Sequence, residues 1–251
     1  MNLGTIQVHK QNKVATITFF HPASNSFPSE LLQRLIDTIK RVGENPEVNV
    51  IVLQSEGEKT FCAGASFDEL LTIDSLETGK IFFSGFANLI NTMRKCPKLI
   101  IGRIQGKTVG GGVGIIAATD YCFATENADV KLSEFSIGIG PFVIAPAVER
   151  KIGVSALGEL TIDATNWKTA YWAKDKGLYA KVFEHARDMD EAIDILTKNL
   201  TSYSLDAMME MKKILWHDTE HWDKLLYKNA EISGRLVLSE FTKNTLKKFK
   251  K

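Results

Sequence analysis

The sequence has few cysteines, no long apolar run and almost no net charge. Its cysteines, Cys62, Cys96 and Cys122, are widely spaced, match no zinc-binding pattern and cannot all pair, which favours a reducing, cytoplasmic location. No apolar segment approaches the ~20 residues of a membrane span, and the polar N-terminus predicts no signal peptide. Lysine and arginine number 31 against 30 acidic residues, a net charge of +1 that argues against nucleic-acid binding. We therefore expect neither a membrane nor a nucleic acid among its partners.

The sequence does contain enough apolar residues to form a large hydrophobic core. Of its 251 residues, 44% are hydrophobic and 24% are charged, the usual balance of a globular protein. The length suits one large α/β domain, or a domain with a helical appendage. Strand and helix patterns alternate up to about residue 185, and every later pattern is helical. We therefore divide the chain into a predicted α/β core, residues 1–185, and a predicted helical region, residues 186–251.

Local patterns predict most of the individual elements. Alternating residues on either side of Gln11 and Asn12 indicate a β-hairpin. The spacing of leucine and isoleucine after Ser29 predicts a helix that this serine caps. A second helix, over residues 76–95, would bury one side that includes Ile81. The remaining predicted elements are strands at 48–53, 99–104, 120–125 and 177–183, and helices at 143–152, 155–162, 168–176, 190–200, 204–216 and 219–249.

The most informative stretch is rich in glycine and spans residues 102–120. Gly110, Gly111 and Gly112 follow one another, an arrangement that costs backbone entropy and is kept where backbone must approach something closely. A small, apolar segment follows, so the glycines are predicted to lie at the N-terminus of a buried helix. Free N–H groups there favour an anion, or a negative charge that develops during a reaction.

Three interpretations of this stretch compete. A phosphate-binding loop would use Gly102 and Gly106, but one residue too few separates them. A dinucleotide fingerprint would use Gly112, Gly114 and Ala117, but such a fingerprint should follow its strand directly. The third interpretation is an oxyanion hole, which needs a second backbone donor from elsewhere. The small residues Ala63, Gly64 and Ala65, which follow another predicted strand, can supply that donor.

Three segments together resemble the crotonase superfamily of enoyl-CoA hydratases and isomerases. They are residues 61–70, residues 106–120 and residues 132–150, and their order and spacing are specific although each motif alone is weak. The resemblance covers nearly the whole chain, and some of the similar chains are methylglutaconyl-CoA hydratases. It implies a spiral of ββα repeats followed by a C-terminal helical oligomerisation region. A homotrimer or hexamer is implied as well, with Trp216, Trp222, Leu225, Leu226 and Leu236 fitting the interface.

The resemblance also assigns roles to particular residues. The N–H groups of Ala65 and Gly111 would hold the thioester carbonyl, and Glu134 would move the proton. Hydratases of this family usually carry another glutamate where this chain has Gly114. The departure favours isomerisation, or an unusual hydration or dehydration, because one carboxylate can take a proton from one carbon and return it to another. The implied substrate-binding residues are Ala63, Gly64, Gly110, Gly114 and Phe142.

The predicted activity is therefore that of an enoyl-CoA hydratase or isomerase acting on an unsaturated or 3-hydroxy acyl-CoA. Coenzyme A would arrive as part of the substrate, and no metal or other cofactor is expected. Two alternatives stay open. One is a nucleotide-binding oxidoreductase that uses the fingerprint ending at Ala117, and the other is a protein that binds CoA thioesters without turnover.

Overall fold

Two sheets of parallel strands form the centre of the structure, a computed structural model that describes residues 3–248. The main sheet has the order β1-β2-β3-β5-β7-β9, in which only the β1–β2 hairpin is antiparallel. A smaller parallel sheet has the order β4-β6-β8. The strands are β1 Thr5–Gln11, β2 Val14–Phe20, β3 Val50–Ser55, β4 Thr60–Cys62, β5 Leu99–Ile104, β6 Lys107–Val109, β7 Tyr121–Thr125, β8 Val130–Lys131 and β9 Lys181–Phe183.

The chain visits the two sheets alternately, and this produces the spiral. β3, β5 and β7 in the main sheet are each followed by a strand of the small sheet and then by helical structure. The helical elements are α1 Ser29–Glu44, α2 Phe67–Leu70, α3 Leu76–Lys95, α4 Gly111–Ala117, the 3₁₀ helix η1 Glu134–Ile137, α5 Ala145–Ile162, α6 Ala170–Asp175, α7 Ala186–Ser202, α8 Leu205–Leu215, α9 Trp222–Leu236 and α10 Glu240–Lys248. The ββα repeat predicted from the resemblance is confirmed.

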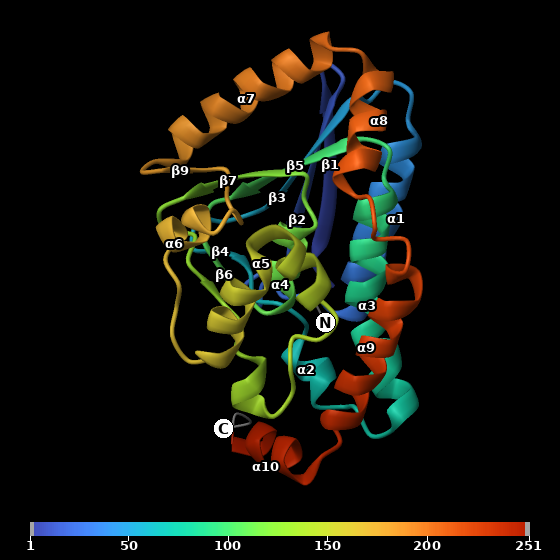
Figure 1. Cartoon of the computed structure of the whole chain (residues 1–251), viewed down its shortest axis with the longest axis vertical. Helices are drawn as coiled ribbons and strands as arrows, with labels where there is room; N and C mark the ends of the chain where they lie inside the picture. The colour runs from blue at the N-terminus through green and yellow to red at the C-terminus, as the bar shows by residue number, and fades with distance from the viewer. Residues whose placement is uncertain (1–2, 249–251) are drawn as a thin grey trace.

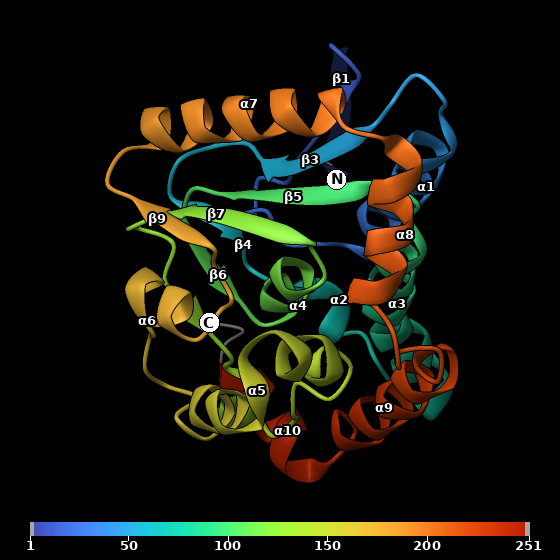
Figure 2. The same cartoon turned by 45° about the horizontal axis from the view of Figure 1, so that its top comes forward.

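Helices cover both faces of the main sheet (Figures 1 and 2). On one face α7 packs Met189 and Ile193 against Val52 and Phe123. On the other face the apolar sides of α1, α3, α4 and α5 form the main core with the strands. Parallel strands covered on both faces are nearly continuous apolar runs, as β3 and β5 are in this sequence.

Three local predictions were wrong in detail. Ser29 is the first residue of α1 and does not cap it with its side chain; its N–H and hydroxyl both donate to the Glu69 carboxylate. Ile81 lies on the solvent side of α3, with 65% of its surface exposed. The predicted helix 219–249 is two helices, α9 and α10, interrupted at residues 237–239. Its end at residue 249 lies outside the described residues.

The C-terminal helices pack onto the rest of the chain. α9 lies along α3, and Tyr227 donates a hydrogen bond to Asn88 across this contact at 2.5 Å. The assignment of Trp216, Trp222 and Leu226 to a subunit interface was wrong, because all three are buried within the chain itself. Whether residues 186–251 serve oligomerisation stays a prediction. Among the described residues, no helix combines the length and apolarity needed to cross a bilayer.

Candidate active site

A small cavity lies where the small sheet, α3 and η1 meet, and it gathers most of the predicted site residues. Its volume is about 160 Å³. From the predicted site it contains Ala63, Gly64, Ala65, Gly110, Gly111 and Glu134. Its remaining lining is mostly apolar and comprises Phe67, Leu70, Phe82, Phe83, Phe86, Val109, Ser133, Ile137, Ile139, Gly140, Pro141, Val143, Ile144 and Ser233. Among the described residues of this lining, Glu134 is the only one with an acidic or basic side chain.

The glycines at the cavity permit a close approach between two loops. Gly64 has a φ of +86°, and a Cβ atom there would lie 3.0 Å from the Val109 carbonyl oxygen and 3.3 Å from the Gly111 nitrogen. A Cβ atom on Gly111 would lie 2.5 Å from the Phe86 ring. A side chain at Gly64 would push the two loops apart, and one at Gly111 would push its loop away from α3. The sequence therefore keeps glycine at both places, and the loops after β4 and β6 meet at the cavity.

Two backbone N–H groups at this junction have no acceptor. Within residues 3–248, neither Ala65 nor Gly111 donates a backbone hydrogen bond, although their neighbours do. Ser66 donates to the Phe27 carbonyl, and Gly110 donates to the Lys131 carbonyl. Gly111 is the first residue of α4, where an N–H has no partner within its own helix. The two predicted donors therefore belong to residues that line one cavity, and neither N–H has a backbone acceptor in the part of the chain that the structure describes.

Glu134 brings its carboxyl group to the same junction. A Cβ atom on Gly110 would lie 3.0 Å from Oε1 of Glu134. The residue as a whole is partly exposed at the start of η1, but its Oε2 is inaccessible to solvent and has no hydrogen-bond partner among the described residues. Desolvation raises the pKa of Glu134 to about 7, and a hydrogen bond from its own backbone N–H offsets this only partly. Such a carboxyl group can accept or donate a proton near neutral pH.

Two predicted substrate-binding residues do not line the cavity. Gly114 is buried inside α4, and a Cβ atom there would lie 2.4 Å from Cγ2 of Ile144. Ile144 lines the cavity and occupies the space into which a longer side chain at position 114 would extend. Phe142 instead lies over Gly140, where a Cβ atom would be 2.6 Å from its ring. Val143 and Ile144 line the cavity in its place.

The residues of the dinucleotide fingerprint are not accessible to a ligand. Gly112, Gly114 and Ala117 are all buried in α4. A Cβ atom on Gly112 would lie 2.7 Å from the Thr108 side chain and 2.8 Å from Cys62. Gly112 is explained by packing against β4 and β6, and Gly114 by packing against Ile144, so the structure offers no support for a nucleotide there.

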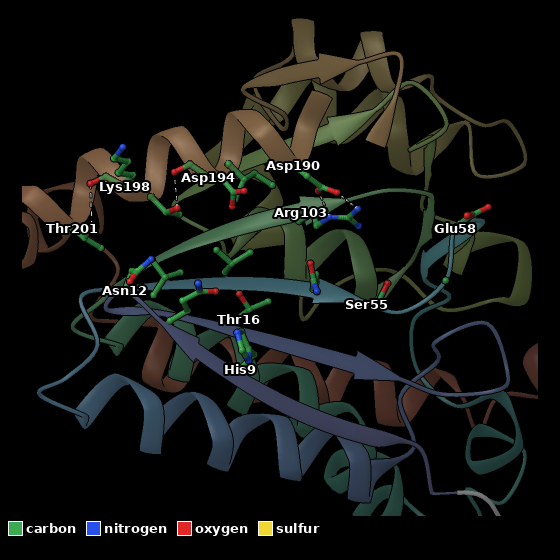
Figure 3. A pocket seen from close by; sticks show the side chains of 17 residues that line it. His9, Asn12, Thr16, Ser55, Glu58, Arg103, Asp190, Asp194, Lys198 and Thr201 are labelled. Atoms are coloured by element: carbon green, nitrogen blue, oxygen red, sulfur yellow. Dashed lines mark hydrogen bonds and ion pairs between the residues drawn. The ribbon is translucent and has the colours of Figure 1, made fainter. Parts of the chain in front are cut away.

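A much larger groove lies elsewhere and contains none of the predicted site residues. Its volume is about 1090 Å³, and it runs between α7 and the outer face of β1, β2 and β3 (Figure 3). Charged side chains in it either reach solvent or pair, as Arg103 does with Asp190, whose Oδ1 lies 2.5 Å from the arginine Nε. Volume alone would identify this groove as the active site. Among its described lining residues, however, no side chain has a buried polar atom without a hydrogen-bond partner. Among residues 3–248, no cluster of three or more potential metal ligands was found in it or anywhere else.

Sequence analysis missed one polar residue of the cavity. Ser233 comes from α9, 89 positions after Ile144, the last of the other lining residues, and is only 1% exposed. The available signal was its neighbour Gly234, because a glycine inside a helix often marks a close helix contact. Here Gly234 lies against Gly79 of α3.

Comparisons with known proteins agree on one family. A sequence model of the family "Enoyl-CoA hydratase/isomerase" matches residues 9–249. The chain is 27% identical to a short-chain-enoyl-CoA hydratase of Clostridium acetobutylicum, over 99% of this chain and 95% of the relative. It is 26% identical to a peroxisomal Delta(3,5)-Delta(2,4)-dienoyl-CoA isomerase of Arabidopsis thaliana, over 86% of this chain and 83% of the relative.

A solved structure shares the fold throughout. The crystal structure of an enoyl-CoA hydratase from Bacillus halodurans superposes with a TM-score of 0.90 at 21% identity, over 97% of this chain and 99% of that one. The family match spans almost the entire chain, including both loops that meet at the cavity and the segment that carries Glu134. The chain belongs to the enoyl-CoA hydratase/isomerase family of the crotonase superfamily.

Proposed function

We propose that the chain catalyses proton transfer next to the carbonyl of a short enoyl-CoA thioester, with Glu134 as its only acid–base group. The observation that carries this proposal is the desolvated, unpartnered Glu134 carboxyl beside two free backbone N–H groups. Removing a proton beside a thioester makes an enolate, whose oxygen needs preorganised donors. The N–H groups of Ala65 and Gly111 are the proposed donors. With a pKa near 7, the carboxyl can take the proton and also return it.

The reaction best suited to a single carboxylate is isomerisation of a 3-enoyl to a 2-enoyl thioester. Glu134 would take the proton from the carbon next to the carbonyl and return it two carbons further along. Within residues 3–248 no second carboxylate lines the cavity, and Ile144 fills the space beside Gly114. The enolate needs no redox partner, because the electron pair moves only within the acyl group.

Hydration or dehydration is the second candidate. It is favoured by the 27% identity, over 99% of the chain, with a short-chain-enoyl-CoA hydratase. In dehydration Glu134 would remove the proton next to the carbonyl and pass it to the leaving hydroxyl, which departs as water. Hydration would be the reverse of this step. A methylglutaconyl thioester is one such substrate class. A homotrimer or hexamer also remains a proposal, which size-exclusion chromatography with light scattering would test.

Turnover of two matched substrates tests the proposal. The wild type and Glu134→Gln would be given but-3-enoyl-CoA and crotonyl-CoA, and products would be separated by chromatography. Faster conversion of but-3-enoyl-CoA identifies an isomerase, and faster hydration of crotonyl-CoA identifies a hydratase. Both activities should fall by at least about 100-fold in Glu134→Gln, the usual size of an acid–base contribution. Wild-type binding without any turnover would instead support the alternative of a non-catalytic thioester-binding protein.

A further inference from the structure

Ser233 carries a hydroxyl that no group within residues 3–248 uses as a hydrogen-bond partner. It is 1% exposed and lines the cavity. Its hydroxyl forms no hydrogen bond with any of residues 3–248, whereas other buried hydroxyls, such as those of Thr119 and Thr125, donate to carbonyl oxygens. The hydroxyl is therefore available to hydrogen-bond a ligand that enters the cavity. A ligand that shielded it from water without supplying a partner would leave it unpaired, which is unfavourable.

A close helix crossing places Ser233 in the cavity. At the contact between α3 and α9, a Cβ atom on Gly79 would lie only 2.8 Å from the Gly234 Cα atom. The two backbones can touch only because both residues are glycine. The close contact allows the neighbouring Ser233 to line the same cavity as the side chains of Phe82 and Phe83 of α3.

The same helix shows that Ser233 lies far from the proposed oxyanion hole. Gly111 packs against Phe86 of α3, and Ser233 lies at the level of Gly79. Seven residues of helix correspond to about 10 Å along the axis. Between the two levels the lining is apolar, with Phe82, Phe83 and Leu70. A thioester whose carbonyl lay at Gly111 would point the end of its acyl chain towards Ser233.

The size of the cavity limits that chain. The volume of about 160 Å³ suits a short acyl group better than a long fatty chain. If this group were a hydrocarbon, it would leave the hydroxyl of Ser233 unpaired. Alanine would serve better there, because it buries no polar atom and favours the helix more strongly.

We propose that Ser233 is a specificity-determining residue that hydrogen-bonds an oxygen-bearing substituent at the far end of a short acyl-CoA. The substituent is a hydroxyl or a carboxylate, both of which accept a hydrogen bond from the serine. This inference rests on the proposed function, since it assumes that the thioester carbonyl lies at Ala65 and Gly111. It adds the chemical class of the acyl group to that function.

Binding of saturated analogues tests the inference without requiring turnover. Isothermal titration calorimetry would compare hexanoyl-CoA with 5-hydroxypentanoyl-CoA and with glutaryl-CoA, which present a methyl, a hydroxyl and a carboxylate at the same end. The proteins would be the wild type, Ser233→Ala and Ser133→Ala. The last is the matched control, because it removes the other serine hydroxyl of the cavity lining.

We expect the wild type to bind at least one oxygen-bearing analogue roughly fivefold more tightly than hexanoyl-CoA, the scale of one hydrogen bond. The preference should disappear in Ser233→Ala and persist in Ser133→Ala, and the favoured analogue identifies the charge of the substituent. Equal or tighter binding of hexanoyl-CoA by the wild type would overturn the inference, as would a preference that Ser233→Ala retains. Failure of all three analogues to bind would instead contradict the proposed function.

Discussion

The two hollows of this molecule differ in the property that matters for chemistry. The groove beneath α7 is the larger, at about 1090 Å³, and its charged groups reach solvent or pair with one another. The cavity under α3 is about 160 Å³, and it removes one carboxyl oxygen from water without giving it a partner. The surroundings of an ionisable group determine its pKa and therefore its suitability for catalysis. The comparison indicates that desolvation of Glu134, rather than the size of a hollow, marks the proposed active site.

The largest expected effect comes from removing this carboxylate. Glu134→Gln keeps the shape of the side chain and abolishes its acid–base function, so kcat/KM should fall by about 1,000-fold, within the range for such groups. The matched change in the groove is Asp190→Asn, which should leave kcat/KM within about twofold. Steady-state kinetics on the better substrate would check both. Similar losses in the two variants would remove the distinction between the hollows.

The same substitution should change stability in a way that depends on pH. Because burial raises the pKa of Glu134 from 4.5 to about 7, the folded protein binds this proton more tightly than the unfolded chain. Stability is therefore lost as pH rises from about 4.5 to about 7. Glu134→Gln removes this cost and should stabilise the protein by about 3 kcal/mol at pH 8, and far less at pH 5.

Urea unfolding at pH 5 and pH 8 would measure the difference. The control is Glu58→Gln, because Glu58 lines the groove and is exposed. That variant should show the same small change at both pH values. A stability gain in Glu134→Gln that does not depend on pH would show that the carboxyl group is not desolvated.

A methyl group at the loop junction should have the next largest effect. In Gly111→Ala the new Cβ atom would meet the Phe86 ring at 2.5 Å, so the Gly111 N–H would move. Loss of one oxyanion donor usually lowers kcat by about 100-fold. The double variant Gly111→Ala with Phe86→Leu makes room and should recover part of the activity. No recovery in a folded double variant would indicate that the ring contact is not what positions the donor.

The smallest effect is expected from the ion pair of the groove. Arg103 and Asp190 pair at the edge of α7, and the Asp190 side chain is 47% exposed. Arg103→Ala should lower the free energy of unfolding by only about 1 kcal/mol, because an ion pair with one half-exposed partner contributes little. It should leave kcat/KM unchanged. A loss of activity as large as that in Gly111→Ala would show that the groove takes part in the reaction.

Much of the fold follows from local patterns that the structure keeps. Alternation in residues 5–20 predicted the hairpin, and local patterns predicted strands at 48–53 and 99–104, where the structure has β3 and β5. The small residues in the loops after β4 and β6 predicted a close approach of the backbone at both places. These features depend on neighbours in the sequence, and so sequence analysis found them.

What could not be predicted depends on contacts between distant segments. The capping of α1 by Glu69 joins residues forty positions apart. The filling of the space beside Gly114 depends on Ile144, and the placement of Ser233 depends on the crossing of α3 and α9. The desolvation of Glu134 likewise arises from the packing around η1. Which carboxyl group is reactive is therefore a property of tertiary structure, although its position in the sequence could be predicted from the resemblance.

The most direct test of the central claim is exchange of α-protons in a saturated thioester. Butyryl-CoA would be incubated in D₂O with the wild type or Glu134→Gln, and the loss of its α-proton signal would be followed by NMR as pH is varied. Exchange needs only enolate formation and does not depend on whether the enzyme is a hydratase or an isomerase. The account predicts wild-type exchange that rises with pH around a midpoint near 7 and is lost in Glu134→Gln. Undiminished exchange in Glu134→Gln would contradict it.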